Sequence, residues 1–247
     1  MNFSKKDTLI AFGGGTITDL TGYVASTYKR GINFINVPTT TLAMIDASVG
    51  GKNALNMKDI KNAIGTIYSP VKVLVGIDSL STLDERNYNN GLFEALKMGA
   101  ILDKELFNSF VNNSYKENIE EIIAKSILLK KQIVEQDEDE KGLRKILNFG
   151  HTIGHAIELE NDLLHGEAIA NGMLAVSYKK SFYNDLKTAI NNLKCPLVKL
   201  NNIKNVVNDK KVSNNKVDLI VVSTIGNAEI VPTEIEELKR MVSEYVF

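Results

Sequence analysis

The feature that most constrains the fold is a short apolar run that stops at three consecutive glycines. Residues 8–12 are typical of a buried strand, and the glycines at 13–15 are typical of a tight turn into a helix. Three more elements are expected nearby: a helix over residues 16–28 and strands over residues 32–37 and 71–77. Because strands and helix alternate, residues 1–78 are predicted to form a parallel sheet.

The rest of the chain has a different pattern. Helical spacing is seen over residues 90–110, 119–134, 143–159, 167–182 and 234–246, with a hairpin over residues 219–231 around Gly226. We therefore predict an α/β fold with two domains. Residues 1–78 form an incomplete N-terminal nucleotide-binding parallel sheet, and residues 79–247 form a mostly α-helical metal- and substrate-binding domain. Since a nucleotide-binding sheet usually has several βα units, we expect part of the first domain to be missing ahead of the glycine turn.

Composition narrows the class of partner. The formal net charge is −1 and no basic stripe stands out, so neither nucleic acid nor an anionic membrane is expected as a partner. The single cysteine, Cys195, cannot form an internal disulfide. No stretch approaches the roughly 18 apolar residues of a membrane span, and the N-terminus does not have the pattern of a signal peptide. We expect a cytoplasmic protein that acts on a small molecule.

All three histidines lie within residues 151–165. His151 and His155 are four residues apart, so on a helix they share a face. Two imidazoles and one carboxylate make a usual catalytic zinc set. The spacing leaves open which two histidines bind and whether the cluster is an ordinary set of partly buried histidines. Three carboxylates are eligible as the third ligand: Glu94, Glu158 and Glu167.

Two glycine-rich segments indicate anion binding. Bare amide groups at the start of a helix suit a pyrophosphate, so residues 13–15 are a candidate nucleotide loop. The spacing is not G-x-G-x-x-G, and a plain tight turn is the alternative. Paired glycines beside Lys52 indicate backbone close to an anion, with a solvated loop as the alternative. The charged run over residues 135–141 is interpreted as a solvated helix end.

Taken in order, the motifs resemble 3-dehydroquinate synthase, a sugar phosphate cyclase family. The resemblance rests on these motifs: Gly13-Gly-Gly-x-x-x-Asp19, Asp46-x-Ser-Val-Gly-Gly-Lys52, Glu94-Ala-Leu-Lys97, Leu147-Asn-Phe-Gly-His-Thr-Ile-Gly-His155 and His165-Gly-Glu-Ala. It covers essentially the whole chain. The family's additional Pro-Gly-Glu-x-x-Lys segment, which holds the adenosine half of NAD, has no counterpart here, and Asn53 replaces the usual threonine.

The resemblance implies a role for each matching residue. The implied metal ligands are Glu94, His151 and His165, with His155 beside the substrate. The implied catalytic residues are Lys52, Lys97, Lys130, Arg144, Asn148 and His155. The implied substrate-binding residues are Asp46, Asn62, Lys210 and Arg30, the last donated across a dimer interface. The implied nucleotide contacts are Gly14, Gly15, Asp19, Thr39, Thr40, Lys52 and Lys61.

The resemblance also implies a reaction with NAD and one divalent metal, Zn²⁺ or Co²⁺. The family converts 3-deoxy-D-arabino-heptulosonate 7-phosphate into 3-dehydroquinate and phosphate in the shikimate pathway. It does so by transient oxidation, elimination, reduction and an intramolecular aldol step. A catalytic zinc lowers the pKa of bound water from about 15.7 to about 7, whereas a neighbouring lysine shifts a pKa by only about 1–3 units, so the metal is expected to activate the alcohol.

Three alternatives remain beside this reading. The chain is another sugar phosphate cyclase, a metal-dependent polyol dehydrogenase, or a catalytically incompetent fragment that needs a separately encoded N-terminal half. A homodimer and a phosphorylated sugar acid substrate are the expected partners.

Overall fold

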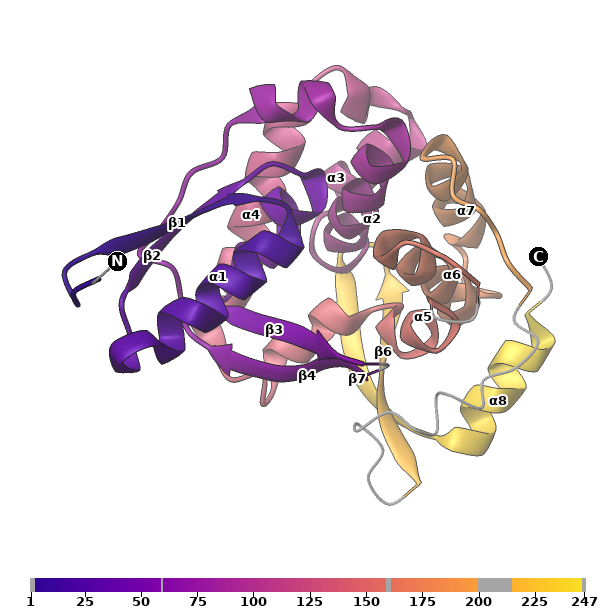
Figure 1. Ribbon diagram of the computed structural model, residues 1–247. Helices are drawn as coiled ribbons and strands as arrows, with labels where there is room; N and C mark the ends of the chain where they lie inside the picture. The colour runs from indigo at the N-terminus through magenta and orange to yellow at the C-terminus, as the bar shows by residue number, and fades with distance from the viewer. Residues whose placement is uncertain (1–2, 59, 159–160, 200–214, 246–247) are drawn as a thin grey trace.

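The computed structural model describes residues 3–58, 60–158, 161–199 and 215–245. Figure 1 shows a small sheet with one helix at the N-terminal end and a group of helices around α2 in the rest of the molecule. This arrangement confirms the predicted α/β class. No helix within the described ranges is long and apolar enough to cross a bilayer.

The N-terminal sheet is parallel, as predicted. Its strands, in the order β1-β2-β5, are β1 (Thr8–Gly13), β2 (Asn33–Pro38) and β5 (Lys72–Val73). Gly13 pairs with Pro38, so the glycine turn follows the carboxyl ends of two neighbouring strands. β5 is much shorter than the strand predicted over residues 71–77. The Leu74 N–H makes a last bond to the Asn36 carbonyl, at 2.8 Å, and a 3-10 helix, η3 (Ile77–Thr82), follows.

Helix α1 (Gly15–Thr27) covers one face of this sheet. Ala25 packs there with Phe34 and Leu9 in a small core. The other face is open, because Ile10 and Phe12 of β1 are 66% and 69% exposed. Parallel sheets are normally covered on both faces, so this apolar surface is unusual for the fold.

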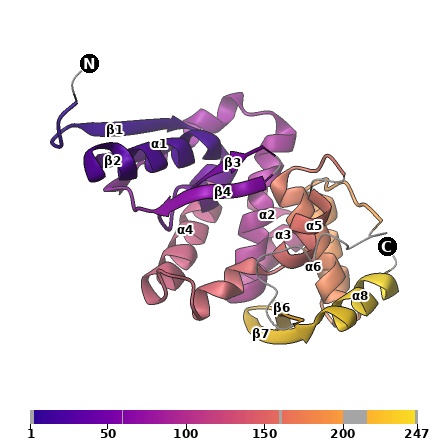
Figure 2. The same ribbon diagram turned by 60° about the horizontal axis from the view of Figure 1, so that its bottom comes forward.

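An antiparallel hairpin, which the sequence analysis missed, follows the glycine pair at residues 50–51. It consists of β3 (Lys52–Met57) and β4 (Ile60–Ile67). Asn53 fixes its base, because its Nδ2 donates to the carbonyls of Gly51, at 3.0 Å, and Tyr68, at 2.8 Å. In both ribbon views the hairpin extends from the side of α1 toward α5 (Figures 1 and 2). The alternative of a solvated loop is therefore wrong from Lys52 onward, where the hairpin begins.

The remaining described elements are mainly helices. The long ones are α2 (Glu85–Leu102), α3 (Lys104–Val111), α4 (Ile119–Gln136), α5 (His151–Glu158), α6 (His165–Ser177), α7 (Tyr183–Asn192) and α8 (Ile235–Glu244). The short ones are η1 (Tyr28–Arg30), η2 (Ala43–Ala47), η4 (Ser114–Lys116) and η5 (Leu143–Asn148). The predicted hairpin is present as β6 (Lys216–Thr224) and β7 (Asn227–Glu234).

Two predicted helices are each divided in the structure. The helix expected over residues 90–110 breaks at Asp103, whose side chain accepts the Leu106 N–H at 2.8 Å and so caps α3. The helix expected over residues 143–159 breaks at Gly150, which has φ +79°. A Cβ at Gly150 would lie 2.7 Å from the Ile169 carbonyl oxygen, so this close approach to α6 needs a glycine. The second break sets the start of α5 at His151.

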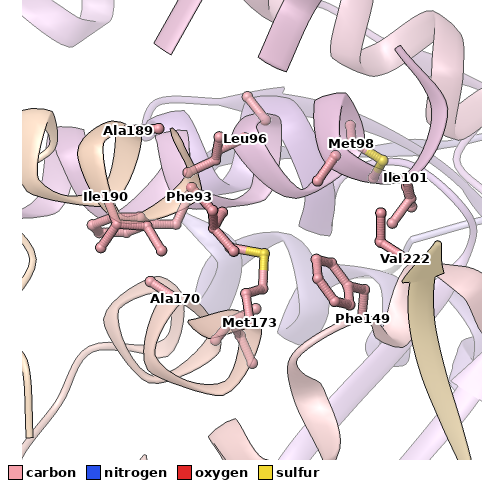
Figure 3. Close-up of a cluster of buried hydrophobic side chains, with 14 of the residues drawn as sticks. Phe93, Leu96, Met98, Ile101, Phe149, Ala170, Met173, Ala189, Ile190 and Val222 are labelled. Atoms are coloured by element: carbon pink, nitrogen blue, oxygen red, sulfur yellow. The ribbon is translucent and has the colours of Figure 1, made fainter. Parts of the chain in front are cut away.

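Helix α2 lies at the centre of the main core. Every residue from 89 to 101 is buried, which is typical of a helix packed on all sides. Figure 3 shows Phe93 and Leu96 of α2 close to Met173 of α6 and Ile190 of α7. The same buried stretch of α2 carries Glu94 and Lys97, so this charged pair lies in a dry environment.

Candidate metal and substrate site

Three imidazoles meet where α5 and α6 begin. His151 and His155 lie on α5, one turn apart, and His165 is the first residue of α6. One ring nitrogen from each lies within 4.8 Å of the others. The Nδ1 of His151 is 3.2 Å from the Phe149 carbonyl oxygen, so Nδ1 carries the proton in the neutral ring and Nε2 has a free lone pair.

A buried carboxylate completes this cluster. Glu94 is fully buried, and its Oε1 lies 3.5 Å from His165 Nε2 and 3.9 Å from His151 Nε2. Its other oxygen pairs with the ammonium of Lys97. Oε1 has no hydrogen-bond partner among the described residues, and an unsatisfied buried acceptor is costly. Tetrahedral zinc ligands at 2.0–2.1 Å lie about 3.3 Å apart, so these residues fit a divalent cation.

The other two eligible carboxylates have different partners. Glu158 Oε2 lies 3.7 Å from Nδ1 of His165, on the opposite side of the ring from Glu94, and Oε1 lies 2.5 Å from the Lys61 ammonium. Glu167 accepts two bonds from Arg86, at 2.7 and 2.8 Å. Of the three, Glu94 is therefore the carboxylate whose free oxygen faces two Nε2 atoms. Glu158 is placed to orient the His165 ring from its Nδ1 side.

The surroundings separate the pKa values of these groups. Burial lowers the pKa of His165, but Glu158 and Glu94 outweigh it and raise that pKa to about 9. Burial, with the charge of Lys97, holds the pKa of His151 well below its ordinary value. Burial would raise the pKa of Glu94, but Lys97 and His165 lower it overall. Without metal, the cluster therefore holds its proton on His165 at neutral pH.

Protein groups engage two of the candidate substrate cations, Lys130 and Arg144. Lys130 donates to a carboxylate oxygen of Asp46 and to its carbonyl oxygen, both at 2.6 Å. Arg144 donates to the carbonyl oxygens of Gly50, at 2.9 Å, and Glu138, at 2.6 Å. Burial lowers the pKa of Arg144. These contacts join α4 to η2, and η5 to the glycine pair ahead of β3.

Five of the seven candidate nucleotide contacts lie at the start of α1 or just after β2, namely Gly14, Gly15, Asp19, Thr39 and Thr40, whereas Lys52 and Lys61 lie on β3 and β4. Gly14 is the N-cap of α1, and a Cβ there would lie 3.0 Å from the Thr40 side chain. The Thr39 N–H donates to the Gly13 carbonyl at 3.0 Å. Asp19 lies on the first turns of the same helix, and burial raises its pKa to about 6 despite a backbone hydrogen bond from Ala54.

Two of the predicted residues, Arg30 and Asn62, lie elsewhere. Arg30 is exposed in η1, after the C-terminal end of α1, about 20 Å along the helix from the glycine turn. Asn62 is exposed on β4, next to Lys61, and its N–H donates to Asn56 Oδ1 at 3.0 Å. Lys210 lies outside the described residues.

Comparison with known proteins identifies the family. A family profile described as 3-dehydroquinate synthase N-terminal matches residues 1–90, and one described as 3-dehydroquinate synthase C-terminal matches residues 91–213. The chain belongs to the 3-dehydroquinate synthase family. The 3-dehydroquinate synthase of Dictyoglomus thermophilum is 44% identical over 248 residues, which cover 92% of this chain and 70% of that protein.

Solved structures of related cyclases share the fold. The 2-epi-5-epi-valiolone synthase of Streptomyces hygroscopicus subsp. jinggangensis, with NAD⁺ and Zn²⁺ bound, has a TM-score of 0.83 and 26% identity, covering 95% of this chain and 73% of that one. A 2-deoxy-scyllo-inosose synthase with carbaglucose-6-phosphate, NAD⁺ and Co²⁺ also has a TM-score of 0.83, with 25% identity over 99% of this chain and 76% of that one.

One acidic residue that sequence reasoning did not single out lies among the candidate substrate residues of this family member. Glu140 forms an ion pair with Lys52 and accepts a hydrogen bond from Asn148. Charged residues surround it in the sequence, and residues 135–141 alone predict a solvated helix end. Only the fold brings β3 and η5 to the same carboxylate, so no local sequence signal was available.

Proposed function

We propose that this chain carries the metal and substrate site of a 3-dehydroquinate synthase and takes part in converting 3-deoxy-D-arabino-heptulosonate 7-phosphate into 3-dehydroquinate and phosphate. The observation that carries the proposal is the buried Oε1 of Glu94, which accepts no hydrogen bond from the described residues and faces the Nε2 atoms of His151 and His165. The proposed ligands are therefore Glu94, His151 and His165. His155 is assigned to the substrate, although its ring centroid lies 5.2 Å from that of His151 and 5.8 Å from that of His165.

Two bound groups would supply chemistry that the side chains lack. A Zn²⁺ or Co²⁺ ion in this seat would act as a Lewis acid toward a substrate hydroxyl. NAD at the glycine turn would accept and return the hydride. The support is the family membership together with the NAD⁺ and metal ions bound to the related cyclases.

The chain's own residues position the substrate and balance charge. Lys97 neutralises the second oxygen of Glu94 inside the core, so the Glu94 carboxylate stays ionised. Lys130 and Arg144 are held by Asp46 and by backbone carbonyls on the neighbouring side of the site. Fixed cations of this kind orient an anionic substrate without reorganising during the reaction.

The ligand assignment is tested by metal content and turnover together. Glu94→Ala and His151→Ala should each lose zinc, measured by atomic absorption after dialysis, and lose phosphate release from the substrate. His155→Ala should keep the zinc and lose most turnover. If both Glu94→Ala and His151→Ala retain stoichiometric zinc and near-normal turnover, the site is wrong. If His155→Ala loses zinc while Glu94→Ala keeps it, the three imidazoles are the ligands instead.

A second candidate function is another sugar phosphate cyclase, since two such enzymes share the fold. Turnover on a different sugar phosphate, with none on the heptulosonate, would favour it. A polyol dehydrogenase would instead accumulate NADH without releasing phosphate. Both outcomes are read from one assay that follows phosphate and absorbance at 340 nm together.

We also propose that a further α/β segment, on this polypeptide or a separate one, covers the open face of the β1-β2-β5 sheet. The exposed Ile10 and Phe12, and the free edge of β1, support it. Calorimetry with NAD tests the idea, because the residues described here should bind NAD tightly only when that segment is added. We further propose that the chain forms a homodimer with Arg30 at the interface. We also propose that the protein is cytoplasmic.

A further inference from the structure

One face of α2 contacts the first turn of α6 through three residues that are spaced four apart. Arg86, Asn90 and Glu94 lie on successive turns of α2, so they share a face. Their respective partners are consecutive residues at the start of α6, namely Glu167, Gly166 and His165. The last of these three contacts joins two proposed metal ligands, and the other two contacts lie beside it on the same helix face.

Asn90 supplies a cap that α6 lacks. The first N–H groups of a helix need acceptors from outside the helix, and the N-cap residue of α6 is Leu164, which has no polar side chain. The Oδ1 of the buried Asn90 accepts the Gly166 N–H at 2.7 Å. A Cβ at Gly166 would collide with the Asn90 carbonyl oxygen, so the two helices touch at this point. Asn90 therefore fixes the distance between the helix that carries Glu94 and the turn that begins at His165.

Arg86 holds the same turn through a buried carboxylate. Its Nε and Nη2 donate to the two oxygens of Glu167, at 2.7 and 2.8 Å, and Glu167 also accepts the Leu164 N–H at 2.8 Å. Two parallel bonds from a guanidinium fix the angle of a carboxylate as well as its distance. Arg86 is the second residue of α2, where the helix dipole disfavours a cation. The stability of α2 itself therefore does not explain an arginine at this position.

The place of this turn determines where the His165 ring lies. His165 is the first residue of α6, and its Nε2 lies 3.5 Å from the free oxygen of Glu94. A metal site needs its ligand atoms within about 0.2 Å of their ideal distances. A small shift or rotation of the first turn of α6 would thus move one ligand away from the others, while Glu94 stays fixed in the core.

We propose that Arg86 and Asn90 are positioning residues for the metal site, which hold His165 at the spacing that a divalent cation needs from the other two ligands. Arg86 acts through Glu167, and Asn90 acts through the Gly166 N–H. The inference rests on the proposed function, because that function makes His165 a metal ligand.

Zinc affinity is the first readout, measured by competition with a chromophoric chelator at constant pH. Arg86→Lys keeps the positive charge but cannot donate two parallel bonds to Glu167, so it should weaken zinc binding about tenfold. Glu85→Gln is the matched control at the same end of α2. It breaks the exposed ion pair of Glu85 with Lys194, 2.6 Å long, which does not involve α6, and should shift the affinity by less than about twofold.

Two more measurements separate positioning from a purely structural role. Glu167→Gln should also weaken zinc binding about tenfold, and adding Arg86→Lys to it should cause little further loss, because both changes break one contact. The visible absorption bands of bound Co²⁺ depend on the geometry of its ligands. They should change in Arg86→Lys and in Asn90→Ala, and stay the same in Glu85→Gln.

A purely structural role would give a different result. The Arg86 and Asn90 variants would then unfold at lower urea concentration but keep the zinc affinity and the Co²⁺ bands of the unmodified chain, and this outcome would overturn the inference. Failure of the proposed function is recognised separately, because Glu94→Ala would then retain its zinc.

Discussion

The state of His165 in the metal-free protein predicts how zinc affinity depends on pH. Its pKa is raised to about 9, whereas the pKa values of His151 and Glu94 are lowered. A metal ion must therefore displace one proton, from His165, over the whole neutral range. Competition with a proton of pKa about 9 weakens the apparent zinc affinity about 80-fold between pH 8.5 and pH 6.5. An ordinary histidine, with pKa about 6.5, would weaken it only about twofold.

The assay is calorimetric titration of the metal-free chain with Zn²⁺ at several pH values. Running it in two buffers with different ionisation enthalpies gives the number of protons released, which should be close to one at pH 7.5. Glu158→Gln removes a carboxylate that raises the His165 pKa, so it should flatten the pH dependence. His155→Ala is the control and should leave it unchanged. A change of less than about fourfold in the unmodified chain would refute the reasoning.

Two further predictions concern stability without metal, measured by urea unfolding followed by circular dichroism. Lys97→Met leaves the fully buried Glu94 without its cation and should lower the free energy of unfolding by about 3–5 kcal/mol, while the double variant Glu94→Gln/Lys97→Met should lie close to the unmodified chain. Asp19 has a folded-state pKa of about 6 against 3.8 for the free side chain, so its folded form binds the proton more tightly and stability falls as pH rises between these values. Asp19→Asn should therefore raise the free energy of unfolding by about 1–2 kcal/mol at pH 7.5, a figure already discounted for the partial exposure of the side chain. At pH 3.5 the substitution should leave the free energy of unfolding unchanged. An unchanged free energy of unfolding at pH 7.5 would contradict the prediction.

The N-terminal sheet was predictable because its signals are local. An apolar run before consecutive glycines marks β1 and the start of α1, and the structure places both within a residue or two of the prediction. The β3–β4 hairpin was not predictable in the same way. Its strands are partly buried on both faces, so they show no clear alternation of apolar and polar residues.

In the candidate site, too, only the features with a local sequence signal were predictable. The spacing of His151 and His155 indicated a shared helix face, and both lie on α5. Spacing could not select the carboxylate, because Glu94 reaches the histidines from another helix. The break at Gly150 was missed for a similar reason, since the close approach of α6 that requires a glycine comes from a distant part of the chain.

The contact between Lys61 and Glu158 connects the hairpin of β3 and β4 to His165, a proposed metal ligand. The same hairpin begins at Lys52, beside the glycine pair. A ligand that shifts the hairpin must therefore disturb the carboxylate behind His165, and a cation that fixes His165 must hold the hairpin in return. Binding of a ligand beside the hairpin and binding of a cation at His165 are thus expected to be cooperative. Each should change the affinity of the other by the same factor.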